Sequence, residues 1–137
     1  MSQLYASLFY QKDVTEIFSD SSLITYMIQV EVALAQAQAQ VGVIPQNAAN
    51  TIAQVAEQAL EKFDFSALAV ATGLAGNIAI PFVKQLTAIV KDTDEDASRY
   101  VHWGATSQDI LDTACILQCR DALKIVEGQL LSWAVES

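Results

Sequence analysis

The sequence predicts an all-α protein, because it has the apolar spacing of helices and few of the residues that make turns. Apolar residues recur at alternating steps of three and four through long segments, which places them on one face of a helix. Only five glycines and two prolines occur among the 137 residues, too few for the turns of a β-rich chain. At 53% hydrophobic residues, the chain can bury the core of one ordinary domain.

The first long helix is predicted from Leu23 to Val41. Ser21 or Ser22 can cap its start, and Gly42 lies just past its end. Glu31 is the only charged residue within it, so we expect much of its surface to face other protein. The apolar face consists of Leu23, Met27, Val30, Leu34, Ala37 and Val41.

A second helix is predicted to open at Pro45, since proline is favoured in the first turn, where its missing N–H costs nothing. Its apolar positions extend far enough for one continuous helix. They are Ile52, Val55, Ala59 and Phe63, all on one side.

Two further helices are predicted before residue 91. A short one lies within residues 64–74 and closes near Gly73, and another begins at Pro81. The charged run "KDTDED" at residues 91–96 is predicted to be a solvated connection, because its spacing fits no calcium-binding loop. The inward residues of the helix that begins at Pro81 are Phe82, Leu86 and Ile89.

The last helix is predicted to begin near Asp109, with Thr106 or Ser107 as its N-cap. Its apolar residues form a seam typical of a long helix in a near-parallel bundle. No helix stop signal follows, so we expect the chain to be part of a longer one, and the seam to pack against other chains or further residues. The seam consists of Ile116, Cys119, Leu123, Val126, Leu130 and Trp133.

Charge and composition exclude several classes of function. The net charge of −9 and the pI near 4.2 argue against nucleic-acid or anionic-membrane partners. No run of 18 apolar residues and no basic, apolar leader is present, so we expect a soluble, cytoplasmic protein. Two cysteines four residues apart on a helix suit neither an ordinary disulfide nor, with a single histidine, a metal site.

A polar cluster interrupts the helices in the stretch "RYVHWGATSQDILDTA", residues 99–114. Thr106, Ser107 and Gln108 stand together at a predicted helix start, just after His102 and Gly104. Two hydroxyls, an amide and free backbone N–H groups can bind a carboxylate. Capping needs only one of these hydroxyls, but a plain helix cap is the alternative interpretation.

A second polar interruption is "GLAGNIAIPF", residues 73–82. Two glycines and Asn77 break an apolar stretch just before the proline that opens the next helix. The loop can be an ordinary connection between helices, or it can bring its backbone and the Asn77 amide close to a ligand.

The run "HWGATSQDILDTA", residues 102–114, resembles the first signature region of the fumarase/aspartase superfamily. Within that superfamily, the runs "GNIAIPFVK" at residues 76–84 and "LYASLF" at residues 4–9 are similar to the bacterial 3-carboxy-cis,cis-muconate cycloisomerases. The adenylosuccinate lyases of the superfamily carry a histidine where this chain has Asn77, which favours the cycloisomerase branch.

The resemblance implies a mostly helical enzyme that forms a homotetramer and builds each active site from three subunits. It implies an N-terminal helical domain at residues 1–105 and the first part of a central bundle helix at residues 106–137. The implied reaction closes a carboxylated muconate to a carboxymuconolactone in the breakdown of protocatechuate, and it implies no cofactor and no metal. The superfamily's general base and acid have no counterpart here, so we expect the 137 residues alone to be inactive.

The resemblance also implies the substrate-binding residues. Thr106, Ser107 and Gln108 match the region that binds substrate carboxylates, and Asn77 falls in another substrate-contacting loop. His102, the first residue of the signature run, is expected to line the same pocket. Two alternatives stay open. One is a C–N lyase of the same superfamily, and the other is a non-catalytic helical interaction module, for which the apolar seam would serve equally well.

Overall fold

The computed structural model describes residues 11–136, and within that range the chain forms helices and no strand, as predicted. No helix in this range combines the length and apolar character needed to cross a bilayer. The helices are α2 (Lys12–Ile17), α3 (Asp20–Gln40), α4 (Gln46–Ala56), α5 (Ala59–Lys62), α6 (Phe65–Ala75), α7 (Ala79–Lys91), α8 (Glu95–Ser98) and α9 (Ser107–Glu136).

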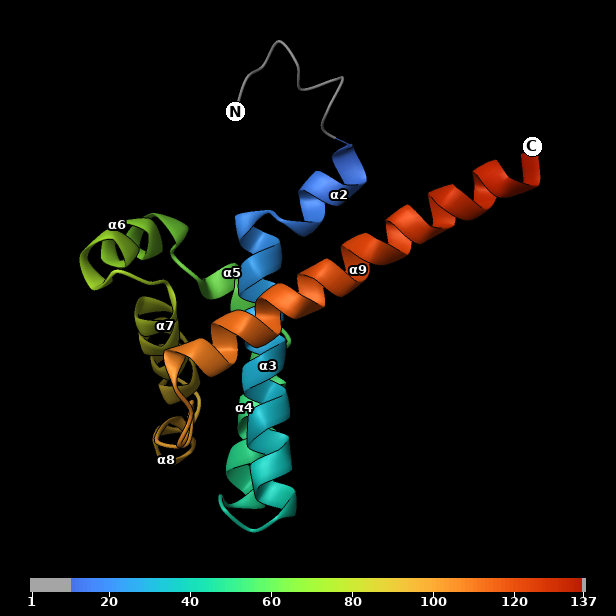
Figure 1. The fold of residues 1–137 in the computed structure, drawn as a ribbon. Coiled ribbons are helices and arrows are strands. Elements are labelled where there is room, and N and C mark those ends of the chain that lie inside the picture. The colour runs from blue at the N-terminus through green and yellow to red at the C-terminus, as the bar shows by residue number, and fades with distance from the viewer. Residues whose placement is uncertain (1–10, 137) are drawn as a thin grey trace.

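The core forms around α3, which runs beside α4 and is crossed by α9 (Figure 1). Helices α6, α7 and α8 lie together on one side of this crossing. Burying a side chain as completely as Phe82, which is 0% exposed, contributes about 2 kcal/mol. The most deeply buried large side chains are Phe82, Ile24, Met27, Ile52, Leu86, Ile110, Glu31 and Val90.

The first long helix begins earlier than predicted. α3 starts at Asp20, and its N-cap is Ser19, whose hydroxyl oxygen accepts the N–H of Ser22 at 3.3 Å. The choice of Ser21 or Ser22 as cap is therefore wrong: both lie in the first turn, whereas Ser19 has the extended backbone that a capping residue needs. Gly42, at φ +76°, follows the helix end as predicted.

The second predicted helix is divided in two. α4 begins directly after Pro45 and ends at Ala56, and the short α5 follows from Ala59. The predicted apolar residues of this segment are all buried. Phe63 nevertheless lies beyond the end of α5, where its ring stacks on Phe82 with the centroids 5.3 Å apart. A contact with a distant helix thus sets the path of the chain here.

Helix α6 ends at Ala75, with Gly76 as its C-cap, and not near Gly73, so that predicted boundary is wrong. Gly76 has the left-handed φ of +78°, and its N–H donates to the Thr72 carbonyl at 2.9 Å, whereas Gly73 lies inside the helix. The predicted start at Pro81 is also two residues late. Helix α7 begins at Ala79, and Pro81 still occupies the first turn, where an N–H is not required.

The charged run at residues 91–96 is only partly an irregular connection. The carboxylate of Asp94 accepts the backbone N–H groups of Asp96 at 2.9 Å and Ala97 at 3.0 Å, and so begins the short α8. The spacing of charges predicted solvation but could not show that one of these acids caps a helix.

Helix α9 begins at Ser107, two residues before the predicted start. Thr106 stands at the capping position, and the Asp109 carboxylate accepts both its N–H at 2.8 Å and its hydroxyl at 3.0 Å. This is the reach-back half of a capping box, in which an acid in the first turn satisfies the residue before the helix. The bonds that fix the helix start are therefore carried by Thr106 and Asp109.

The two faces of α9 have different surroundings. One face, with Ile110, Ala114, Gln118 and Ala122, is buried against the other helices. The predicted apolar seam lies on the other side, and its aliphatic and tryptophan side chains are 41–73% exposed. Figure 1 shows the C-terminal half of α9 extending well away from the other helices. This chain alone leaves the seam in contact with solvent, as the sequence predicted.

A cluster around Asp121 connects α9 to α3. The Tyr26 hydroxyl donates to one oxygen of Asp121 at 2.5 Å, while Arg120 and Lys124 donate to the other at 3.0 and 2.7 Å. These hydrogen bonds, the one from Arg120 foremost, hold the pKa of Asp121 far below its usual range.

We predict that Asp121→Asn destabilises the chain at neutral pH more than in acid. A carboxyl whose pKa is lowered by folding stabilises the fold above its unfolded pKa, about 3.9, and this stabilisation is lost as the pH falls through the folded pKa. The denaturant midpoint of the variant should lie below that of the wild type at pH 7, and the difference should shrink below about pH 4. The exposed Asp92 provides a matched control, as Asp92→Asn. A difference that grows in acid would contradict this account.

A second prediction separates the cap from the hydroxyl beside it. Asp109→Ala removes both bonds to Thr106 and should lower the free energy of unfolding measurably. Ser107→Ala should change it by less than about 0.5 kcal/mol, because in the described residues the Ser107 hydroxyl makes no hydrogen bond. Urea unfolding of both variants measures this. The reverse order would make Ser107 the residue that fixes the helix start.

Candidate functional site

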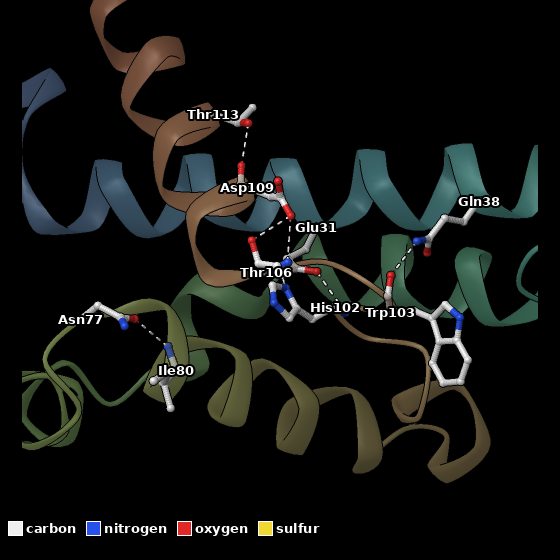
Figure 2. Close-up of polar contacts among 9 residues, drawn as sticks. All are labelled: Glu31, Gln38, Asn77, Ile80, His102, Trp103, Thr106, Asp109 and Thr113. Carbon is white, nitrogen blue, oxygen red and sulfur yellow. Dashed lines mark hydrogen bonds and ion pairs between the residues drawn. The ribbon is translucent and has the colours of Figure 1, made fainter.

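The candidate site lies where the loop before α9 crosses α3 (Figure 2). In this loop His102 has a φ of +58° and Gly104 a φ of +70°, both in the left-handed region. For a residue other than glycine this conformation costs roughly 1–2 kcal/mol, so the surrounding structure must hold His102 in place. His102 is the only residue other than glycine with a positive φ among residues 11–136.

Glu31, from the middle of α3, holds His102 in this conformation. One carboxylate oxygen lies 2.6 Å from Nδ1 of His102, and the other accepts the backbone N–H of His102 at 3.1 Å. The Glu31 side chain is 1% exposed and that of His102 is 16% exposed. Burial raises the pKa of Glu31, although its contacts with His102 act in the opposite direction.

Gln38 attaches the same loop to α3 at a second point. It lies two helical turns beyond Glu31, and its amide nitrogen donates to the carbonyl oxygen of Trp103 at 2.6 Å. Its amide oxygen is buried and has no partner among the described residues. Two consecutive residues of the loop are thus bound to one face of α3.

The three predicted donors at the start of α9 differ in how free they are. The hydroxyl of Thr106 donates to Asp109, and the amide of Gln108 donates to Asp112 on the next turn. Ser107 keeps its hydroxyl free within the described part of the chain, and the N–H groups of a first helical turn have no partner in the helix. Ser107 is therefore the hydroxyl that is available without rearrangement, and Gln108 retains one amide N–H.

Asp109 places a negative charge beside these donors. Its hydrogen bonds from Thr106, first from the N–H and then from the hydroxyl, lower its pKa, and the charge of His102 acts in the same direction. An anion that binds at this helix start is repelled by Asp109.

Asn77 lies apart from this loop, at the start of α7 (Figure 2). Its amide oxygen accepts the N–H of Ile80 at 3.3 Å, so in this structure the side chain helps to begin a helix. No hydrogen bond joins Asn77 to the other predicted residues in the described range. His102 and Thr106 lie in the loop before α9 and Ser107 and Gln108 in its first turn, whereas Asn77 lies in the segment between α6 and α7.

Two hollows bear on where a ligand could bind. One of about 340 Å³ lies between α3 and the start of α9, with Gly104, Ala105 and Asp109 in its wall. A larger one, about 540 Å³, lies against α3, α4 and α5, and Glu57 is the only charged residue in its wall. The larger hollow offers no cation to a carboxylate. No group of three possible metal-ligating His, Cys, Asp or Glu side chains occurs within residues 11–136.

Sequence reasoning missed Glu31, Gln38 and Asp109 as parts of the site. The sequence contains a signal for Glu31. It is the only charged residue of the helix predicted at residues 23–41, and it lies four residues from both Met27 and Ala35 in the buried face. Such an isolated charge indicates a paired interior acid. Gln38 has no such signal, because glutamine recurs along this helix and only the fold shows which one meets the loop.

Comparison with known proteins gives the family. A family model described as "Lyase" matches residues 10–132. The 3-carboxy-cis,cis-muconate cycloisomerase of Acinetobacter baylyi is 79% identical over 95% of this chain, and the nitrosuccinate lyase of Streptomyces davaonensis is 43% identical over 82%. The chain spans 29% and 23% of these two relatives.

A crystal structure of the corresponding cycloisomerase from Acinetobacter calcoaceticus matches 94% of this chain with a TM-score of 0.92 and 78% identity, and the match covers 30% of that structure. The signature run lies on the loop and first turns of α9, and the run at residues 76–84 begins α7. The run at residues 4–9 lies outside the described residues. The chain belongs to the lyase family of the fumarase/aspartase superfamily.

Proposed function

We propose that this chain forms the N-terminal part of an enzyme that converts 3-carboxy-cis,cis-muconate to a carboxymuconolactone. The observation that carries the proposal is the identity of 79% to the Acinetobacter baylyi cycloisomerase over 95% of this chain. An identity of about 40% would not distinguish this reaction from others of the family, because the nitrosuccinate lyase is 43% identical and its name describes a different reaction.

The reaction adds a carboxylate oxygen across a conjugated double bond. In the reverse direction, a proton leaves the carbon next to a carboxylate, and negative charge grows on that carboxylate. Hydrogen-bond donors fixed in advance stabilise such charge most effectively. The Ser107 hydroxyl, the first N–H groups of α9 and His102 form a donor set of this kind on a loop that α3 holds.

The other predicted residues have supporting roles in this proposal. Thr106 donates to the substrate only after exchanging its bond with Asp109, whereas the Gln108 amide has one N–H bonded to Asp112 and a second N–H left to donate, beside the free hydroxyl of Ser107. Asn77 binds substrate from the segment before α7. The general acid and base come from residues outside this chain. No cofactor takes part.

The proposal includes assembly and location. The exposed seam of α9 suits a helix that packs against other long helices in a homotetramer, in which residues 106–137 begin the central bundle and residues 1–105 form a separate helical domain. The substrate is a small polycarboxylate, the pathway is protocatechuate breakdown, and the enzyme is cytoplasmic. Neither nucleic acid nor membrane is a partner, in keeping with the net charge of −9.

A chimera tests the activity. The 137 residues replace the corresponding part of the Acinetobacter baylyi relative, and the purified protein is assayed with 3-carboxy-cis,cis-muconate and with adenylosuccinate. The proposal expects turnover of the muconate alone. Fumarate release from adenylosuccinate would favour a C–N lyase, and inactivity with both substrates would oppose this function.

We predict that Ser107→Ala lowers kcat/KM of the chimera by roughly 100-fold, because a donor to growing negative charge is lost. Ser66→Ala, which removes an exposed hydroxyl on α6, is the matched control and should leave the rate unchanged. Gln108→Ala should reduce kcat/KM less, and Asn77→Ala should mainly raise KM. If Ser107→Ala keeps kcat/KM within a factor of two, Ser107 does not bind the reacting carboxylate.

A further inference from the structure

The pairing of Glu31 with His102 limits which atoms of these two side chains can carry a proton. Nδ1 of His102 faces the Glu31 carboxylate at 2.6 Å, so one proton lies between these two atoms. With only that proton, the pair has a net charge of −1, and Nε2 is a bare acceptor. With a second proton, the pair is neutral, and Nε2–H is a donor whichever partner holds the shared proton.

The surroundings favour the neutral pair. Glu31 is almost fully buried, and within residues 11–136 its two oxygens make hydrogen bonds only to the ring and backbone of His102. A buried net charge is costly, whereas a neutral, hydrogen-bonded pair avoids this cost. The negative charge of Asp109, from α9, also interacts electrostatically with the imidazole. Two acidic side chains from different helices, Glu31 and Asp109, thus act on His102.

Nε2 of His102 has no hydrogen-bond partner in the described part of the chain. It belongs to the loop that carries Ser107, and the strained backbone of His102 is held by the same carboxylate. Glu31 therefore determines both the position and the proton state of this ring.

We propose that Glu31 is a positioning residue that keeps a proton on Nε2 of His102, so that the imidazole donates a hydrogen bond to a carboxylate of the substrate. The role in substrate binding rests on the proposed function, whereas the proton state of the pair does not. In this role the ring offsets the repulsion that Asp109 exerts on an anion at the start of α9.

Nuclear magnetic resonance of this chain tests the proton state directly, because His102 is its only histidine. Long-range ¹⁵N–¹H couplings of the ring show which nitrogen carries a proton. We expect a proton on Nε2 at pH 7 and a strongly downfield proton between Nδ1 and Glu31. A bare Nε2 at pH 7 would overturn the proposal.

Two substitutions at position 31 separate proton control from simple support of the loop. In Glu31→Gln, the amide N–H₂ can donate to Nδ1 while the amide oxygen accepts the His102 N–H, so Nε2 keeps its proton. In Glu31→Ala, both contacts are lost. In the chimera we expect the Gln variant to keep KM within about threefold and the Ala variant to raise KM about 10- to 100-fold, with a smaller effect on kcat.

Gln38→Met is the matched control, because it removes the other attachment of the loop to α3 and leaves the Glu31–His102 pair intact. We expect it to change KM less than Glu31→Ala does. Equal effects of the two variants, or an unchanged KM in Glu31→Ala, would overturn the positioning role. An unsubstituted chimera without cycloisomerase activity would instead oppose the proposed function, and the resonance measurement would still decide the proton state.

Discussion

The pairing of a buried carboxylate with one strained residue determines the geometry of this molecule's polar loop. Glu31 contacts both Nδ1 and the backbone N–H of His102, a residue 71 positions away in sequence. An unpaired buried carboxylate would be costly, and a histidine with a φ of +58° is unfavourable alone. The hydrogen bonds between the two residues offset both costs, the burial of the Glu31 carboxylate and the left-handed backbone of His102. This contact holds the loop at His102, and the bonds between Thr106 and Asp109 fix the start of α9 that follows it.

The other elements keep this contact in place. Helix α4 and the core around Met27 and Ile52 fix α3, so that Glu31 and Gln38 face the loop. The Asp121 cluster and the buried face of α9 fix the opposite side of the crossing. With both helices held, the first turn of α9 presents its N–H groups at a defined place beside His102, as donor preorganisation requires.

The longer helices and the position of the polar cluster could be predicted from periodicity and turn residues, because these depend on local spacing. The short α2 and α8 were not predicted. Of the predicted apolar face of α3 only Met27 is buried, and Val41 is 75% exposed. Boundaries at Ser19, Gly76 and Asp94 could not be predicted, since several neighbouring residues can cap a helix and the backbone path selects among them. The bend before α5 depends on Phe63 reaching Phe82, which is a long-range contact. Within the site, Ser107 and His102 were identifiable from their chemistry, but the pairing of His102 with Glu31 depends on how two distant segments cross.

The central claim is that a loop held by α3 presents Ser107 and His102 to a substrate carboxylate. A crystal structure of the chimera with the lactone product bound tests it most directly. The account predicts a carboxylate oxygen about 3 Å from the Ser107 hydroxyl and from Nε2 of His102, with the Glu31 contacts unchanged. A product bound elsewhere, with neither of these atoms in contact with it, would contradict the account.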